Sequence, residues 1–295
     1  MSQPLFTGSG VALVTPMTPD GIDLPALDRL IDRQLDAGTD ALIVCATTGE
    51  GATLTYAERS AVIAHSIECA AGRVPVIVGT GSNNTASAAA LSRDACAMGA
   101  DGVLVVTPYY NKATQRGLIR HFTAVADAVD RPLIVYNVPS RTGVSCTAET
   151  YAVLAQHPNI VGVKEASGSF ALIQDTRNLC GDGFSVWSGN DEDTAAICAL
   201  GGVGVISVAA NLVPCEMHEL VRLCLADRLL EAGRMQLRLA PLLRALFCEV
   251  NPIPVKTALA QLGLCSGTLR LPLCEMGAEN REALLRTMAE YGVSA

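Results

Sequence analysis

Ile160-Val161-Gly162-Val163-Lys164-Glu165 is a short apolar segment that carries one of the three lysines of the chain. A run of four to eight mostly apolar residues bounded by turn signals is typical of a buried β-strand, so we expect a strand over residues 160–165. Burial lowers the pKa of a lysine and leaves a neutral amine, which is nucleophilic toward carbonyl carbon. The alternative is a strand-end lysine that reaches water or pairs with Glu165.

Seven further segments have the same strand-like character and alternate with stretches of helical periodicity. The predicted strands cover residues 10–15, 41–46, 75–79, 102–107, 132–137, 160–165, 184–188 and 204–208, and helices are expected over 24–37, 56–71, 85–98 and 115–127. Eight strands separated by helices predict a (β/α)8 barrel. The alternative, a doubly wound open sheet, lacks its glycine-rich turn, because Thr15-Pro16-Met17-Thr18-Pro19 follows the first strand.

Beyond the eighth strand the pattern is helical only, from residue 214 to residue 291. This stretch exceeds the single helix that would close a barrel. We therefore expect residues 1–225 to form the barrel and residues 226–295 to form a C-terminal extension of three helices. Four residues are expected to cap helix N-termini: Thr55, Thr85, Ser169 and Asp191.

Composition limits the classes of function. The chain has 295 residues and a net charge of −8, which argues against nucleic acid as a partner. Its apolar stretches are too short to span a membrane, and Met1-Ser2-Gln3-Pro4-Leu5 does not begin a signal peptide. We therefore expect a cytoplasmic protein. Anionic small substrates remain compatible with this charge, because one arginine in a cleft can dominate its surroundings.

The cysteines and histidines form no recognisable metal motif. Eleven cysteines are present without a C-x-x-C pair, which predicts free thiols in a reducing compartment. The four histidines show neither H-x-H nor H-E-x-x-H spacing. No metal site is expected, and acid–base chemistry must come from other residue types.

The expected facing of side chains brings a phenol beside the amine. Side chains alternate along a strand, so Lys164 should share a face with Gly162 and Ile160. Tyr136 likewise shares a face with Ile134 on the neighbouring strand. Both Lys164 and Tyr136 can then point into the barrel, where Gly162 leaves room for a long side chain.

Polar residues follow several strand ends, where the active sites of barrels of this kind lie. Thr47, Tyr110 and Tyr136 can pass protons along a hydrogen-bonded chain, which Schiff-base chemistry needs. Thr48 with its loop backbone, and Arg141 with its planar fork, can each hold a carboxylate. The structural alternatives are turn threonines, interface tyrosines and a solvated loop arginine.

Taken together, these motifs resemble the dihydrodipicolinate synthase family, which belongs to the N-acetylneuraminate lyase superfamily. The resemblance covers nearly the whole chain in the right order. It is carried by Thr47-Thr48-Gly49-Glu50, Gly79-Thr80-Gly81-Ser82-Asn83, Thr107-Pro108-Tyr109-Tyr110-Asn111, Tyr136-Asn137-Val138-Pro139-Ser140-Arg141-Thr142-Gly143, Val163-Lys164-Glu165-Ala166, Gly204-Val205-Ile206-Ser207 and Asn251-Pro252-Ile253-Pro254-Val255-Lys256.

The resemblance implies a Schiff-base lyase that condenses pyruvate with L-aspartate 4-semialdehyde in the diaminopimelate branch of lysine synthesis. It implies that pyruvate binds covalently to Lys164 and that neither an organic cofactor nor a catalytic metal is needed. It also implies self-association, usually as a homotetramer built from two dimers, with a dimer as the alternative. A related lyase acting on a 2-keto-3-deoxy sugar acid or a sialic acid, and a non-catalytic pyruvate- or amino-acid-binding member, remain alternatives.

The resemblance also implies a role for each site residue. Tyr136 corresponds to the general acid/base, and Thr47 and Tyr110 to the rest of a proton relay, with Tyr110 reaching across a subunit interface. Thr48 corresponds to a backbone contact to the pyruvate carboxylate, and Arg141 to the residue that binds the semialdehyde carboxylate. The backbone of Ile206 is implied to lie near the pyruvate subsite.

A regulatory lysine site of the family is only partly matched. Tyr56, Arg59 and Ser87 stand where lysine-inhibited members carry two histidines and a glutamate. Loss of that carboxylate and gain of a cation predict weak or absent inhibition by lysine. The positions that correspond to this allosteric site are Gly51, Ala52, Tyr56, Arg59, Asn83, Ser87 and Tyr109.

Overall fold

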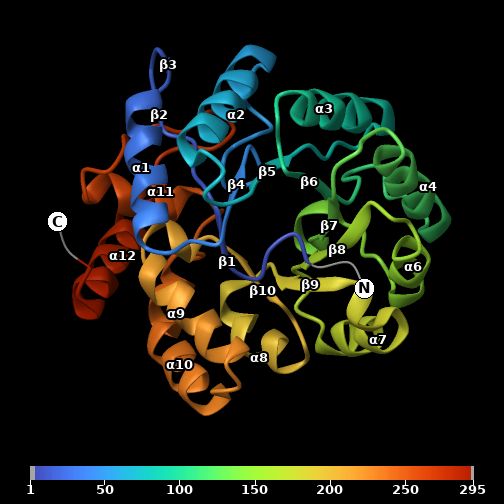
Figure 1. Ribbon diagram of the computed structural model, residues 1–295. Coiled ribbons are helices and arrows are strands. Elements are labelled where there is room, and N and C mark those ends of the chain that lie inside the picture. The colour runs from blue at the N-terminus through green and yellow to red at the C-terminus, as the bar shows by residue number, and fades with distance from the viewer. Residues whose placement is uncertain (1–3, 294–295) are drawn as a thin grey trace.

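A closed barrel of eight parallel strands forms the centre of the protein (Figure 1). The computed structural model describes residues 4–293. The strands follow one another around the barrel in the order β1, β4, β5, β6, β7, β8, β9 and β10, so the predicted (β/α)8 fold is confirmed and the open sheet is excluded. Their bounds are β1 (Gly8–Ala12), β4 (Ala41–Val44), β5 (Val76–Gly79), β6 (Gly102–Val106), β7 (Leu133–Asn137), β8 (Ile160–Glu165), β9 (Ser185–Ser188) and β10 (Gly204–Ser207).

Helices surround this barrel, and a small hairpin of β2 (Met17–Thr18) and β3 (Gly21–Ile22) follows the first strand. The hairpin and the short helix after β7 were not expected from the sequence. The helices are α1 (Leu24–Asp36), α2 (Tyr56–Ala70), α3 (Thr85–Ala97), α4 (Gln115–Ala126), α5 (Pro139–Thr142), α6 (Ala148–Leu154), α7 (Phe170–Cys180), α8 (Thr194–Ala199) and α9 (Pro214–Leu225). Three 3-10 turns complete the ring: η1 (Gly181–Gly183), η2 (Asp191–Asp193) and η3 (Ala209–Asn211).

Two of the four predicted N-caps are confirmed. Thr55 forms a capping box at the start of α2, and Ser169 caps α7. The prediction for Thr85 is wrong, because Asn84 accepts the hydrogen bond from the third residue of α3 and Thr85 is the first helical residue. Asp191 is not a cap either: it begins η2, and its carboxylate binds backbone at the end of β10.

The core has two layers, inside and outside the barrel wall. The outer layer lies between the strands and the helices and includes Val163, Phe184 and Val205. The inner layer fills the barrel and includes Tyr136 and Trp187. The barrel is therefore packed rather than hollow below its mouth.

The predicted orientation of Ile160 is wrong, because the pairing of β8 with β7 contains an irregularity. The register with β7 shifts, so that Leu133 pairs with Ile160 but Ile134 pairs with Gly162. A bulge of this kind breaks strict alternation, and Ile160 joins the outer core layer instead of sharing the inner face with Lys164. The room at Gly162 is taken by the Ser185 carbonyl oxygen and the ring of Trp187, which lie 2.2 and 2.8 Å from where a Cβ would lie.

Three helices follow α9, as expected: α10 (Leu229–Ala245), α11 (Ile253–Gln261) and α12 (Ala278–Tyr291). They pack against α8, α9 and η3 at one side of the barrel (Figure 1). Leu239, Val255 and Leu284 belong to the same outer core cluster as the barrel helices. We therefore propose residues 1–225 and 226–295 as two structural parts that share one core.

All eleven cysteines lie within the described residues and all are free, which confirms the expected free thiols. Cys45 and Cys224 are buried in the core, whereas Cys198 is half-buried. None of the described helices is both long and apolar enough to cross a membrane.

Candidate active site

Lys164 lies inside the barrel near the end of β8, between Tyr136 of β7 and Trp187 of β9. Its side chain is only 4% exposed, so it does not reach water. Its Nζ atom lies 4.5 Å from the centre of the Tyr136 ring. Glu165 points to the other side of the strand, where its carboxylate accepts a 2.7 Å hydrogen bond from the Tyr151 hydroxyl. Both structural alternatives for Lys164 are therefore excluded.

Burial lowers the pKa of Lys164 to about 8. Loss of hydration is the main cause, and the positive charge of Arg141 acts in the same direction. The negative charge of Asp191 partly opposes them. The amine is therefore neutral in an appreciable fraction of molecules near neutral pH, in contrast with an exposed lysine.

The three lysines of the chain have three different environments. Lys112 is exposed. Lys256 is fully buried, but its Nζ lies 2.6 Å from Glu50 Oε1 and 2.6 Å from the Thr268 carbonyl, so its charge is compensated. Lys164 has no such carboxylate partner among the described residues. It is the lysine suited to act as a nucleophile.

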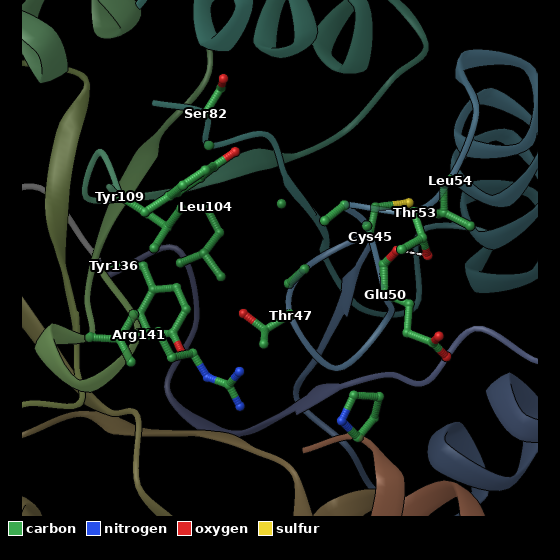
Figure 2. A pocket seen from close by; sticks show the side chains of 18 of the residues that line it. Cys45, Thr47, Glu50, Thr53, Leu54, Ser82, Leu104, Tyr109, Tyr136 and Arg141 are labelled. Carbon is green, nitrogen blue, oxygen red and sulfur yellow. Dashed lines mark hydrogen bonds between the residues drawn. The ribbon is translucent and has the colours of Figure 1, made fainter. Parts of the chain in front are cut away.

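A cavity of about 560 Å³ opens beside Lys164 at the mouth of the barrel. Thr47, Tyr136 and Arg141 line it, and Figure 2 shows the Thr47 hydroxyl directed toward the other two side chains. Lys164 is not itself among the described lining residues, and it is linked to the cavity through Tyr136, whose ring centre lies 4.5 Å from its Nζ atom. The structure thus brings together four of the predicted site residues.

The phenol of Tyr136 is buried, and this burial raises its pKa. The positive charge of Arg141 and the nearby Thr47 hydroxyl act in the opposite direction. A neutral phenol results, and a neutral phenol can both donate and accept a proton in hydrogen bonding. This suits an acid–base group better than a permanently ionised one would.

The loop after β4 turns sharply and so directs Thr47 into the cavity. Cys45 and Glu50 both have positive φ angles, of 55° and 51°. A Cβ at Gly51 would lie 2.0 Å from the Cys45 carbonyl oxygen, so only glycine fits there. The Thr15 hydroxyl donates to the Gly49 carbonyl at 2.7 Å and joins this loop to the end of the first strand.

The C-terminal extension holds the same loop through three residues that we call the C-terminal anchor: Asn251, Lys256 and Arg270. The Asn251 amide donates to the Thr48 hydroxyl at 3.0 Å, and Lys256 and the Arg270 backbone N–H donate to the two carboxylate oxygens of Glu50. The Glu50 carboxylate is thus bound by the C-terminal extension. Sequence reasoning missed the anchor, although the Asn251-Pro252-Ile253-Pro254 motif that contains its first residue was recognised as part of the resemblance.

Arg141 is placed by the short helix α5. Pro139 begins this helix and Gly143, with a φ angle of 71°, ends it. One Arg141 nitrogen donates to the Asn251 carbonyl at 3.2 Å, so the anchor also restrains this side chain. The prediction of a site arginine is compatible with this geometry, because Arg141 lines the cavity, although the residue as a whole is exposed.

Three other predicted residues lie outside the cavity lining. Thr48 is buried against Asn251, and the side chain of Ile206 is packed in the inner core layer. Tyr110 is 89% exposed and has a φ angle of 72°. Within a single chain, Tyr110 is therefore not brought into the site.

The predicted allosteric positions divide into two groups. Those that line the outer part of the same cavity are Gly51, Ala52, Tyr56, Arg59 and Tyr109, whereas Asn83 and Ser87 are not among its described lining residues. Arg59 donates to the Gly79 carbonyl at 2.6 Å and to the Gly51 carbonyl at 3.4 Å. Its guanidinium is thus held by backbone at the wall of the cavity.

Asp191 is a second residue whose role sequence reasoning missed. It is buried, and its Oδ2 accepts hydrogen bonds from the backbone of Val208 at 3.1 Å and of Ala209 at 3.0 Å. Burial raises the pKa of its carboxyl, while the charge of Lys164 lowers it. The only signal in the sequence was a capping-type residue after a strand.

A buried lysine beside a tyrosine and a cavity at the mouth of a (β/α)8 barrel defines the class of barrel enzymes that use a lysine nucleophile. Within this class, the chain belongs to the dihydrodipicolinate synthetase family, whose model matches residues 5–291.

Individual relatives support this assignment over their full length. The 4-hydroxy-tetrahydrodipicolinate synthase of Thermoanaerobacter sp. (strain X514) is 50% identical over 98% of both chains. That of Geobacter sulfurreducens is 51% identical over 97% of this chain and 99% of its own. The solved structure of dihydrodipicolinate synthase from Aquifex aeolicus has a TM-score of 0.95 and 46% identity, covering 98% of this chain and 99% of its own.

Proposed function

We propose that the protein condenses pyruvate with L-aspartate 4-semialdehyde to give 4-hydroxy-tetrahydrodipicolinate. The observation that carries this proposal is Lys164, which is buried, has no carboxylate partner within residues 4–293 and contacts Tyr136 beside the cavity. Relatives at about half identity bear the name of this synthase.

In the proposed reaction Lys164 binds pyruvate covalently and is regenerated at the end. The neutral amine of Lys164 attacks the keto carbon of pyruvate, and loss of one water gives an imine. Removal of a methyl proton gives an enamine, whose carbon forms a bond to the aldehyde carbon of the semialdehyde. The aldehyde oxygen takes up a proton. The amino group of the semialdehyde then attacks the imine carbon, closes the ring and releases Lys164.

Each of these steps moves a proton, and we assign this role to Tyr136. Its ring lies beside Lys164, and the Thr47 hydroxyl, which is directed toward it in the cavity, would pass protons onward. We assign Tyr110 of a neighbouring subunit as the outer member of the relay, since its side chain is exposed within one chain.

The two substrate carboxylates need two separate sites. We assign the pyruvate carboxylate to the backbone around Thr48, with the backbone of Ile206 nearby. We assign the semialdehyde carboxylate to Arg141, whose guanidinium faces the cavity and can form two parallel hydrogen bonds.

The assignment of Tyr110 implies self-association, and we propose a homotetramer built from two dimers. The exposed tyrosines Tyr56, Tyr109 and Tyr110 would form part of the contact between subunits. Assembly varies among relatives, because one solved neighbour is described as a monomeric dihydrodipicolinate synthase variant. We place the protein in the cytoplasm, because its eleven free cysteines suit a reducing compartment.

A substrate comparison tests the proposed reaction. The purified protein is assayed with pyruvate and L-aspartate 4-semialdehyde, and in parallel with glyceraldehyde and with N-acetylmannosamine in place of the semialdehyde. Turnover should be fastest with the semialdehyde. Faster turnover with either sugar aldehyde would assign the protein to a different lyase, and binding of pyruvate without any turnover would assign it as a binding protein.

The rate of covalent pyruvate attachment should rise with pH. Below its pKa of about 8, Lys164 is mostly protonated, so the rate should increase about tenfold per pH unit from pH 6 and level off above pH 8. The measurement is borohydride quenching at short times followed by mass spectrometry. A profile that is flat between pH 6 and pH 8 would contradict the assigned neutral amine.

Replacing Tyr136 with phenylalanine should lower kcat by about 10²- to 10⁴-fold, the usual contribution of a positioned proton-transfer group. The ring that contacts Lys164 is kept, so trapping of pyruvate on Lys164 should still occur, although more slowly. Steady-state kinetics and trapping measure the two effects. Tyr291→Phe on α12 is the matched control, and an equal loss in both variants would argue against the assigned role.

L-lysine should inhibit the enzyme weakly or not at all. The Arg59 guanidinium repels the ammonium groups of lysine, and Ser87 supplies no carboxylate to receive one. The measurement is initial rate against L-lysine concentration, with L-alanine as the control amino acid. Half-inhibition at sub-millimolar L-lysine would overturn this prediction.

A further inference from the structure

Three side chains with metal-binding groups come together on the outside of the barrel, between α1 and α2. Asp28 lies on α1, and His65 and Cys69 lie one turn apart on α2. The two helices are neighbours in the ring (Figure 1). One carboxylate oxygen, one imidazole nitrogen and the thiol sulfur all lie within 4.8 Å of one another.

The contacts within this group converge on one oxygen atom. The Cys69 thiol donates to Asp28 Oδ1 at 2.9 Å, and His65 Nε2 lies 2.7 Å from the same oxygen. Although this second distance is short, the Nε2 atom is buried and makes no hydrogen bond of acceptable geometry within the described residues. An imidazole nitrogen in that situation is available as a ligand.

A nucleophilic role for Cys69 fits this arrangement poorly. The thiolate is the nucleophilic form of cysteine, and burial together with the Asp28 carboxylate raises the pKa of the Cys69 thiol and keeps it protonated. The group also lies outside the barrel and is separate from the cavity that Tyr136 and Arg141 line. The proposed synthase reaction therefore makes no use of it.

We propose that Asp28, His65 and Cys69 bind one divalent zinc ion. Carboxylate oxygen, imidazole nitrogen and thiolate sulfur are the ligand types that zinc prefers, at distances of roughly 2.0 to 2.3 Å. Tetrahedral geometry requires donor atoms roughly 3.3 to 3.8 Å apart. The 2.7 and 2.9 Å separations must therefore widen by less than about 1 Å, which rotation of the half-exposed Asp28 side chain allows.

Binding would release the thiol proton of Cys69 to solvent and leave His65 neutral. The fourth coordination position is open to water, because 47% of the Asp28 side chain is exposed. Asp32 and Glu68 add negative charge near Cys69, and Arg29 is the neighbouring cation. This excess of negative charge around the three side chains favours the binding of a divalent cation.

Such an ion would fasten the first two outer helices to each other. Single-segment motifs in the sequence do not reveal a site of this kind, because its ligands come from two helices. The inference concerns a structural site and goes beyond the proposed reaction.

Metal titration of the intact protein tests the proposal. The protein is stripped with a chelator, and zinc is then titrated in competition with a chromophoric chelator. Cobalt is used as a second probe, because a thiolate ligand gives a charge-transfer absorption in the near ultraviolet. We expect one zinc per chain, a cobalt–thiolate band, and a rise in Tm on zinc addition that grows with the free zinc concentration.

Variants locate the ion. His65→Ala/Cys69→Ser should weaken zinc binding by about 100-fold or more and remove the cobalt–thiolate band. The control His157→Ala removes another histidine that contacts an aspartate, Asp127, at 3.0 Å, and Cys215→Ser removes an exposed cysteine. Both controls should keep the site.

Two outcomes would overturn the proposal: no zinc bound by the parent at micromolar free zinc, or equal binding by the parent and the double variant. The double variant should retain the turnover of the parent and its metal-free circular dichroism spectrum. Weaker zinc binding by this variant can therefore be distinguished from unfolding of the variant. Loss of turnover in the parent itself would count against the proposed function and not against the metal site.

Discussion

Replacing Lys164 with alanine should abolish the trapped pyruvate adduct and lower kcat/KM by about 10⁴-fold or more. Removal of a covalent nucleophile eliminates the imine, the enamine and every later step that depends on them. The measurement combines borohydride trapping, read as the mass of one N-linked carboxyethyl group per chain, with steady-state kinetics. An adduct of undiminished yield in the variant would contradict the assignment of Lys164.

The other two lysines are internal controls for this experiment. Lys112 is exposed, and Lys256 is fully buried against Glu50. Peptide mapping of the parent should place the adduct on Lys164 alone. Lys164→Met is a second variant that separates lost chemistry from lost folding, because removal of a buried, poorly solvated amine should not lower the free energy of unfolding at pH 7.

Replacing Lys256 with methionine should lower the free energy of unfolding by about 3–5 kcal/mol, because the Glu50 carboxylate would remain buried without its cation. Both side chains are at most 1% exposed, so water cannot replace the lost partner. Urea denaturation gives the measurement. Turnover should also fall, because Glu50 belongs to the loop that carries Thr47 and Thr48.

Two further variants define how this loss arises. Lys256→Met/Glu50→Gln removes both charges and should recover part of the lost stability. Arg222→Met removes an ion pair with Glu219 that is about half exposed, and should cost at most about 1 kcal/mol. Equal destabilisation by Lys256→Met and Arg222→Met would contradict the importance of burial.

Local sequence pattern was sufficient for the barrel and for its lysine. Strand-like apolar runs and their alternation with helices are short-range signals, and they predicted all eight strands and the inward-facing pair of Lys164 and Tyr136. The errors arose where two local choices were equivalent. Asn84 and Thr85 are adjacent, and both are good caps, so the sequence alone did not decide between them. The bulge in β8 likewise depends on pairing with β7 and not on β8 alone.

The partners of the site loop were beyond the reach of local reasoning. Glu50 meets Lys256 and Arg270 across 206 and 220 residues of sequence, and no periodicity connects such distant positions. The roles of Asn251 and Asp191 depend in the same way on where the folded chain places them. The assignments of Thr48, Tyr110 and Ile206 stay predictions, since their functions involve bound substrate or a second subunit.

The C-terminal anchor has a consequence for when the site forms during synthesis. A ribosome adds about 5–20 residues per second, so the 206 residues between Glu50 and Lys256 correspond to roughly ten to forty seconds. During that interval the strands of the barrel can emerge and begin to pair. The loop that carries Thr47 and Thr48 nevertheless lacks its buried cation until the final helices leave the exit tunnel. The site loop of a nascent chain is therefore completed only after residues 251–270 have emerged, and a truncated chain that ends before residue 251 would contain Lys164 without a finished site around it.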